Sequence, residues 1–214
     1  MSDTKNKPWW LLAGFVTGRV QNLYDRAAAG DSSARGSLAK LRRSVGQDLG
    51  SQPDVWADVL NGMPAEILGT GDAPSPWEQA AHDALALFAV HQQSQPRFIN
   101  EKGVGLGTAT RRLANPSDAE QFESPVLRRF TSIVAAQDRA TAIHHLRGLI
   151  QQLRAEGIGL DYGMLARDLA FLGTKGDRNV RLRWSRELYT RHTKNAVDEN
   201  DSTDEPTMAT ASAE

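Results

Sequence analysis

The sequence DRATAIHHLRGLIQQLRAEG, residues 138–157, carries the clearest helical pattern in the chain. Asp138 can cap the start of a helix, because a short carboxylate accepts hydrogen bonds from the first backbone N–H groups. Gly157 can end it, because glycine tolerates the left-handed conformation that commonly closes a helix. Between them the apolar residues recur every three or four positions and so share one side of the predicted helix. These residues are Ile143, Leu146, Leu149, Ile150 and Leu153.

Helix starts of the same kind recur along the chain, each a proline in a first turn or a short polar residue before an apolar pattern. They stand at Pro8, Asp31, Pro53, Ser75, Ser124, Asp161 and Asp177. Strand-like alternation is hard to find, and the short links between patterns favour antiparallel neighbours. The sequence therefore predicts an all-α protein, a two-lobed helical bundle of roughly eight or nine helices.

The run SQPRFINEKGVG, residues 94–105, mixes proline, glycine and charge near the middle of the chain and predicts a hinge. We therefore expect an N-terminal helical lobe over residues 1–96 and a C-terminal helical lobe over residues 97–194. Residues 195–214, called the acidic tail below, are small, polar and acidic. Such a composition is typical of disorder.

Charge is spread unevenly over the 214 residues. Residues 97–194 hold 17 Lys and Arg against 10 Asp and Glu, whereas the acidic tail holds six acids and no base. Of the 25 basic residues, 19 are arginine. The guanidinium group of arginine stays charged and makes bidentate hydrogen bonds to phosphate oxygens. This distribution indicates a polyanion partner, above all nucleic acid. The alternative is a solvated basic face, since some chains use arginine in place of lysine throughout.

Several functional classes find no support in the sequence. Cysteine is absent, which excludes disulfides, thiolate metal sites and cysteine nucleophiles and fits a reducing cytoplasm. No uncharged stretch is long enough to span a bilayer, and no histidine pair has the spacing of a helical zinc site. The Gly-x-Ser-x-Gly and Walker patterns are missing. We therefore expect no metal, no cofactor, no membrane contact and no catalytic activity.

The stretch GVGLGTATRR, residues 103–112, contains three glycines. It departs from the dinucleotide-binding fingerprint, because Thr108 stands where the last glycine belongs. The pattern predicts a flexible entry to a helix. In the alternative, functional interpretation, the glycines let backbone N–H groups approach a phosphate while Arg111 and Arg112 supply charge.

Arginines on several predicted helices form the best candidate site. Arg147 and Arg154 are seven residues apart and share a helix face. Arg139 sits in a first helical turn, where its charge opposes the helix dipole unless an anion is near. The tryptophans fall near apolar stripes and are expected in the core, so we predict contact with the nucleic-acid backbone and little base stacking. The predicted nucleic-acid-binding residues are Arg42, Arg43, Arg111, Arg112, Arg128, Arg129, Arg139 and Arg147.

Six segments stand out by their order and spacing: LAKLRR (38–43), GVGLGTATRRLA (103–114), SPVLRRF (124–130), DRATAIHHLRGLI (138–150), GLDYGMLARDLAFLG (159–173) and RLRWSRELY (181–189). Together they resemble the CasB family, the small subunit of the type I-E CRISPR surveillance complex Cascade. The resemblance covers most of the folded chain. It implies an all-helical, two-lobed protein without catalytic activity, present as a pair beside the backbone subunits that hold the guide RNA.

The resemblance also implies partners and a site. In that family, basic grooves steady the target strand and the displaced strand when the guide pairs with DNA. The implied partners are the backbone and large subunits of Cascade, a second copy of the chain, guide RNA and target DNA. Basic positions of the family are matched by Arg42, Arg43, Arg128, Arg129, Arg139 and Arg147. The family usually has arginine at the position of Thr108, so Arg111 or Arg112 is expected to serve instead.

Alternatives to this function stay open. A purely structural helical scaffold would touch only other subunits, with its arginines in ion pairs between proteins. A free-standing helix-turn-helix regulator would need Asn, Gln or Arg at the exposed start of a recognition helix. The helix after Asp161 instead begins with Tyr162, Gly163 and Met164, and an enzyme ranks last.

Overall fold

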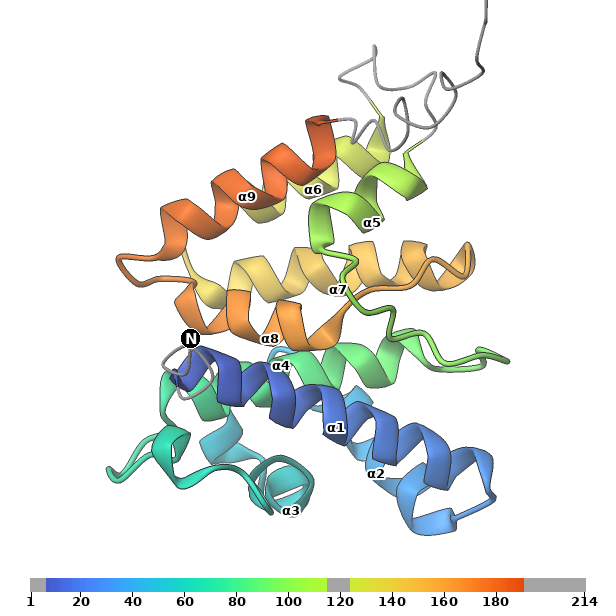
Figure 1. Ribbon diagram of the computed structural model, residues 1–214, viewed down its shortest axis with the longest axis vertical. Coiled ribbons are helices and arrows are strands. Elements are labelled where there is room, and N and C mark those ends of the chain that lie inside the picture. Colours follow the sequence, from blue (N-terminus) through green and yellow to red (C-terminus); the bar gives the residue numbers. More distant parts are fainter. Residues whose placement is uncertain (1–6, 115–123, 191–214) are drawn as a thin grey trace, which may run out of the picture.

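The computed structural model describes residues 7–114 and 124–190. Nine α-helices lie in this part of the chain: α1 (Pro8–Ala28), α2 (Ser32–Arg43), α3 (Trp56–Leu60), α4 (Pro76–His91), α5 (Leu106–Leu113), α6 (Pro125–Ala135), α7 (Arg139–Ala155), α8 (Tyr162–Phe171) and α9 (Asp177–Tyr189). Between α2 and α4 there are three short 3₁₀ helices: η1 (Leu49–Ser51), η2 (Pro53–Val55) and η3 (Ala65–Ile67). β-type pairing among the described residues is limited to one isolated bridge, Asn100 to Leu160. The predicted all-α class is confirmed (Figure 1).

The helix ends follow the local chemistry of the sequence. The carboxylate of Asp138 accepts a hydrogen bond from the backbone N–H of Thr141 at 2.8 Å, and Asp161 accepts one from Met164 at 2.9 Å. These bonds satisfy backbone donors that have no partner inside the helix. Gly157, just past α7, has a φ of +62°, which residues with a side chain rarely adopt.

One predicted cap is wrong. Gly176 is the N-cap residue of α9, and Asp177 is already the first residue of the helix. The carboxylate of Asp177 pairs with Arg181, four residues later, at 2.5 Å. Arg181 also donates to the carbonyl oxygen of Ala136 at 2.8 Å, beyond the end of α6. The aspartate therefore orients an arginine that closes another helix.

The helix α4 lies at the centre of the bundle. Every residue from Glu78 to His91 is buried, because α1, α2, α7 and α8 all pack against it. Figure 1 shows these helices gathered around α4, with α5, α6 and α9 on the side of α7 and α8 away from α1. Five of the buried positions in α4 are alanine, which lets neighbouring backbones come close: Ala80, Ala81, Ala84, Ala86 and Ala89. A helix surrounded in this way needs apolar residues on all sides.

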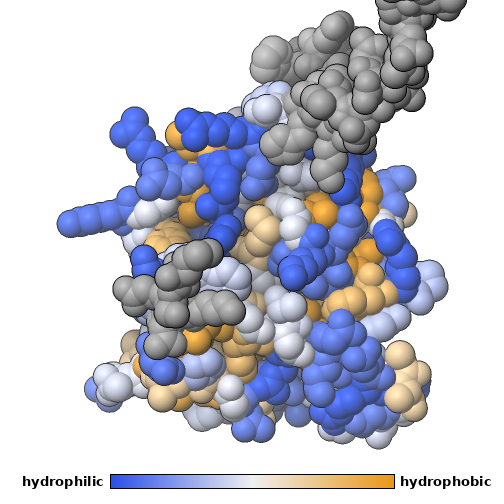
Figure 2. Space-filling model, in the orientation of Figure 1, coloured by the Kyte–Doolittle hydropathy of each residue, from blue (hydrophilic) through white to orange (hydrophobic). Residues whose placement is uncertain are grey.

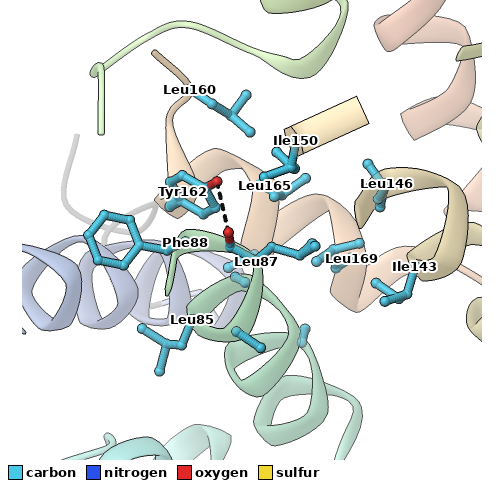
Figure 3. Close-up of a cluster of buried hydrophobic side chains, with 14 of the residues drawn as sticks. Leu85, Leu87, Phe88, Ile143, Leu146, Ile150, Leu160, Tyr162, Leu165 and Leu169 are labelled. Carbon is cyan, nitrogen blue, oxygen red and sulfur yellow. Dashed lines mark hydrogen bonds between the residues drawn. The ribbon is translucent and has the colours of Figure 1, made fainter. Parts of the chain in front are cut away.

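The core between α4, α7 and α8 is drawn in Figure 3. Leu87 of α4 lies beside Leu165 and Leu169 of α8. The ring of Phe88 packs on that of Tyr162, with 5.3 Å between the ring centroids. Tyr162, the first residue of α8, is fully buried, and its hydroxyl donates to the carbonyl oxygen of Leu87 at 3.4 Å. Burial raises the pKa of this hydroxyl well above its ordinary value, so it stays protonated. The bond fixes the start of α8 on α4.

The packing joins helices from both sides of the predicted hinge. Helix α8, from the later half of the chain, packs on α1 and α4 from the earlier half. One continuous hydrophobic core includes residues from all of them. The boundary between lobes at residues 96 and 97 stays a prediction. The predicted disorder of the acidic tail concerns residues outside the described part of the chain.

The tryptophans divide between core and surface. Trp184 is fully buried, and its indole N–H donates to the carboxylate of Asp168 at 2.7 Å. Trp10 and Trp56, by contrast, are 46% and 43% exposed, so the expectation that every tryptophan lies in the core is wrong. On the face shown in Figure 2, hydrophobic residues reach the surface in small groups between hydrophilic ones.

Candidate nucleic-acid interface

Four arginines from two helices line one groove of about 400 Å³. Arg42 and Arg43 come from the last turn of α2, and Arg147 and Arg154 from α7. An adjoining hollow of about 710 Å³ shares Arg42 with the groove and adds Arg35. We call the two hollows together the arginine groove. Among the described residues, no Asp or Glu lines it.

Helical spacing places these side chains together. Two stripes with the same spacing, i, i+4 and i+7, border the groove, and such residues share one face of a helix. On α2 the stripe is Arg35, Ala39 and Arg42, and on α7 it is Arg147, Gln151 and Arg154. Val90 of α4 and Gln93 just after it also line the groove. Because α2 and α7 both pack on α4, that buried helix holds the two stripes on either side of the same hollow.

Within residues 7–114 and 124–190, no carboxylate pairs with the arginines of the groove. Arg35 donates to the carbonyl oxygen of Ala27 at 3.2 Å, and Arg154 to the side-chain oxygen of Gln93 at 3.1 Å. Both acceptors are neutral, so neither cancels the charge of its arginine. Burial, and then the charge of Arg43, lower the pKa of Arg42 from its ordinary value. Like charges held together at a partly desolvated site favour the binding of an anion.

Two further predicted residues, Arg128 and Arg129, lie on α6. The side chain of Arg129 crosses α7 at Gly148, where a Cβ atom would overlap its guanidinium group. Gly148 therefore serves as a slot for an arginine from the neighbouring helix, next in sequence to Arg147 of the groove. Arg128 is exposed on α6. The structure thus brings Arg129 against the same helix that carries one wall of the arginine groove.

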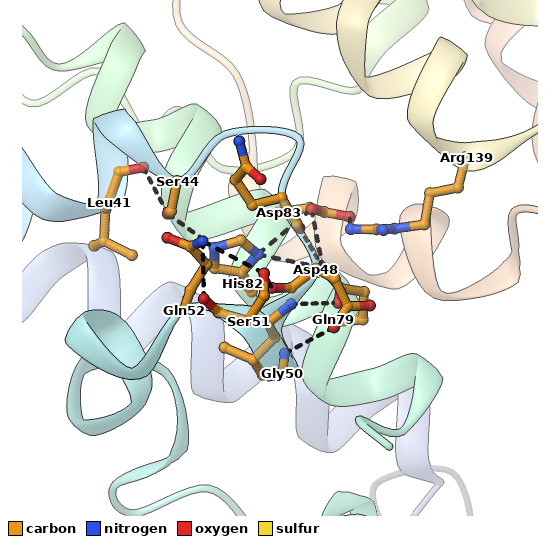
Figure 4. A network of polar contacts seen from close by, with 12 residues as sticks. Leu41, Ser44, Asp48, Gly50, Ser51, Gln52, Gln79, His82, Asp83 and Arg139 are labelled. Atoms are coloured by element: carbon orange, nitrogen blue, oxygen red, sulfur yellow. Dashed lines mark hydrogen bonds and ion pairs between the residues drawn. The ribbon is translucent and has the colours of Figure 1, made fainter.

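Arg139 has a different position from the one its sequence context indicated. It pairs with Asp83 of α4, whose carboxylate is completely buried. The anion that offsets its charge at the start of α7 is therefore part of the chain itself. Figure 4 shows this pair at the edge of a polar network. The network continues through His82, whose Nε2 lies 2.8 Å from the hydroxyl of Ser44. Arg139 joins α7 to α4 and lines neither hollow of the arginine groove.

Arg111 and Arg112 of α5 also have partners inside the molecule. Arg111 donates to the carbonyl oxygen of Glu187 at 3.0 Å and to that of Thr190, at the end of α9. Basic side chains commonly satisfy the last carbonyl groups of a helix in this way. Arg112 pairs with Glu101 at 2.8 Å, and the two side chains are 45% and 40% exposed.

The glycine stretch before these arginines serves helix packing. The backbone N–H of Gly107 donates to the carboxylate of Glu187 at 3.1 Å. A Cβ atom at Gly107 would overlap the carbonyl oxygen of Trp184, so glycine lets α5 approach α9 closely. Burial raises the pKa of Glu187 from its ordinary value. The functional interpretation of the sequence expected a phosphate to accept hydrogen bonds from this backbone. In the structure the carboxylate of Glu187 accepts the hydrogen bond from Gly107 instead.

The helical spacing placed Arg154 on the same helix face as Arg147, but neither Arg154 nor Arg35 was among the predicted nucleic-acid-binding residues. The seven-residue spacing from Arg35 to Arg42 and from Arg147 to Arg154 was the available signal. In the described part of the chain, no three His, Asp or Glu side chains gather to hold a metal ion. None of the helices there combines the length and hydrophobicity that a membrane span requires.

Comparison with known proteins gives matches of two kinds. The model of the family CRISPR-associated protein Cse2 matches residues 37–189. The crystal structure of CasB from Thermobifida fusca is 30% identical, with a TM-score of 0.71, over 84% of this chain and 98% of that one. The crystal structure of CasB from Thermus thermophilus is 24% identical, with a TM-score of 0.57, over 81% of this chain and 97% of that one.

A third solved structure shares the fold. It is a chain of a CRISPR RNA-guided surveillance complex, 21% identical with a TM-score of 0.58, over 81% of this chain and 92% of that one. A search of curated protein sequences finds no significant match.

Proposed function

The chain belongs to the Cse2 family of CRISPR-associated proteins and is similar to CasB, and we propose that it is a non-catalytic subunit of a Cascade-type surveillance complex. In this proposal the arginine groove holds the sugar–phosphate backbone of nucleic acid. The observation that carries it is the convergence of five arginines from α2 and α7 on a groove to which the described part of the chain contributes no carboxylate.

The chemistry of the groove suits backbone binding. Guanidinium groups bind phosphate oxygens in a forked, charge-assisted geometry. Such contacts carry little sequence information and weaken steeply as salt rises. In an RNA-guided complex the guide supplies the sequence specificity through base pairing. R-loop formation is then a near-balanced exchange of duplexes that modest backbone contacts can tip. The groove would stabilise the R-loop or the displaced strand in this way, in the cytoplasm where guide RNA and target DNA meet.

Contacts with other subunits are the second part of the proposal. Leu182 and Tyr189 of α9, seven residues apart, are 47% and 58% exposed, and Trp10 of α1 is also exposed. Large apolar side chains at a surface favour burial against another protein. The proposed partners are the backbone and large subunits and a second copy of the chain. A purely structural scaffold shares these contacts but leaves the arginine groove without nucleic acid.

Charge reversal on both walls of the groove tests the proposal. The double variant Arg42→Glu with Arg147→Glu should bind labelled single-stranded DNA about ten- to a hundredfold more weakly at low salt. The variant makes fewer phosphate contacts, so fewer counterions are released when DNA binds. The matched control, Lys102→Glu with Lys175→Glu, makes the same charge change at exposed loop positions that line neither hollow of the groove. Fluorescence anisotropy measures binding, and circular dichroism checks that both variants fold.

The same variants, assembled with the other subunits, separate the two functions. If the groove variant assembles normally and captures target DNA poorly, the nucleic-acid role is supported. If it fails to assemble while the control succeeds, the arginines serve protein contacts and the scaffold is the better function. Wild-type DNA capture by the groove variant would contradict the proposed site.

A further inference from the structure

The chain carries charge of opposite sign in two separate places. The described residues hold 22 Lys and Arg against 16 Asp and Glu, a net charge of about +6 by formal count. The acidic tail holds no base and six acids. Five of these acids fall within eight consecutive positions: Asp198, Glu199, Asp201, Asp204 and Glu205. A dense anionic stretch therefore follows a cationic folded body on the same chain.

The arginine groove would accept carboxylates as well as phosphates. Arginine binds both with the same forked geometry, and the two anions differ mainly in charge. Arg42, Arg43 and Arg147 make no ion pair with any of the described residues. Their positive charge is therefore available to whichever anion is present at the highest local concentration.

The acidic tail can reach the groove. The last described residue is Thr190, and the five clustered acids lie 8 to 15 residues beyond it. Fifteen residues of extended chain span about 50 Å. A folded body of this size has a radius of gyration of about 16 Å, hence a diameter of roughly 40 Å. Attachment to the same chain also gives the tail an effective concentration in the millimolar range.

We propose that the acidic tail competes with nucleic acid for the arginine groove of its own chain. The proposal rests on the proposed function, since it concerns the same groove. The tail would occupy the groove in the unassembled subunit and suppress its binding to unrelated nucleic acid. Inside the complex, a strand already held by guide pairing presents its phosphates at a higher local concentration and displaces the tail.

Neutralising the tail tests this competition. The triple variant Asp201→Asn, Asp204→Asn and Glu205→Gln should bind labelled single-stranded DNA about three- to tenfold more tightly than wild type at low salt, as expected for loss of a weak intramolecular competitor at millimolar effective concentration. Above a few hundred millimolar salt the difference should vanish, because the Debye length falls below about 8 Å.

A matched control separates competition from overall charge. The triple variant Asp54→Asn, Glu66→Gln and Asp72→Asn makes the same charge change at exposed positions around α3. It should leave DNA affinity within twofold of wild type. The proposed competition would be overturned if both variants gained the same DNA affinity, or if the tail variant gained no affinity. Either result would stand even if the groove itself binds DNA. If wild type and tail variant both fail to bind DNA at low salt, the proposed function fails, and the proposed competition fails with it.

Contact between tail and groove can also be measured without DNA. The chain has no cysteine, so Asn200→Cys provides a single attachment point for a nitroxide spin label. We expect paramagnetic broadening of amide signals around Arg42 and Arg147 at low salt and its loss at high salt. Broadening confined to residues next to the tail in sequence would overturn the proposal.

Discussion

His91 is a buried histidine whose two ring nitrogens have different surroundings. Nδ1 lies 2.9 Å from the hydroxyl of Tyr162, whereas Nε2 is buried without a hydrogen-bond partner in the described structure. Burial is the main cause that lowers the pKa of His91 from 6.5 to about 4. The ring is therefore neutral at neutral pH, with Nδ1 within hydrogen-bond distance of the tyrosine hydroxyl.

This burial predicts a loss of stability in mild acid. Since the folded pKa is about 4 and the unfolded value 6.5, the unfolded chain binds the proton first as the pH falls through that interval. Between pH 7.5 and pH 5 His91 alone should lower the free energy of unfolding by about 2 kcal/mol. His91→Asn, which keeps a donor near Nδ1, should remove that part of the pH dependence. Urea unfolding at both pH values measures it, and an unchanged pH dependence in the variant would contradict the assignment.

The arginines show which part of a site can be predicted from sequence. Period-seven spacing on one helix correctly indicated that Arg147 and Arg154 share a face. It could not indicate which arginines would meet an acid across the fold, because Asp83 and Arg139 are 56 positions apart in sequence. Only packing of α7 on α4 brings that pair together. The groove itself is equally non-local, since its walls come from α2 and α7.

At the level of the helices, prediction succeeded where a few neighbouring residues fix the outcome. Side-chain caps such as Asp138 and Asp161 act within three positions of themselves, so their helices begin as expected. Asp177 failed as a cap because Arg181, held by carbonyl groups of another helix, takes its carboxylate. Gly105 and Gly107, at the start of α5, were ambiguous for the same reason, since their partner is α9.

Close packing of α5 on α9 predicts a specific sensitivity to a single methyl group. Gly107→Ala should lower the free energy of unfolding by about 2–3 kcal/mol, because the new Cβ atom would overlap the carbonyl oxygen of Trp184 and force the helices apart. Gly18→Ala in α1 is the control, since a Cβ atom there meets nothing within 4 Å. It should be neutral or stabilise by up to about 1 kcal/mol. Equal stabilities of the two variants in urea would contradict this packing.

For the whole molecule, the shared core predicts how the chain unfolds. Removing α8 would expose apolar faces of both α1 and α4, so residues 1–96 lack a partner that their own helices need. We therefore expect one cooperative unfolding transition, with helix content and tryptophan fluorescence changing at the same denaturant concentration. Amide hydrogen exchange should give α4 and α8 similar opening free energies. Two separated transitions, or a stably folded fragment of residues 1–96, would show instead that the hinge divides independent lobes. In a single cooperative unit, the two walls of the arginine groove are held in place by the stability of the entire bundle.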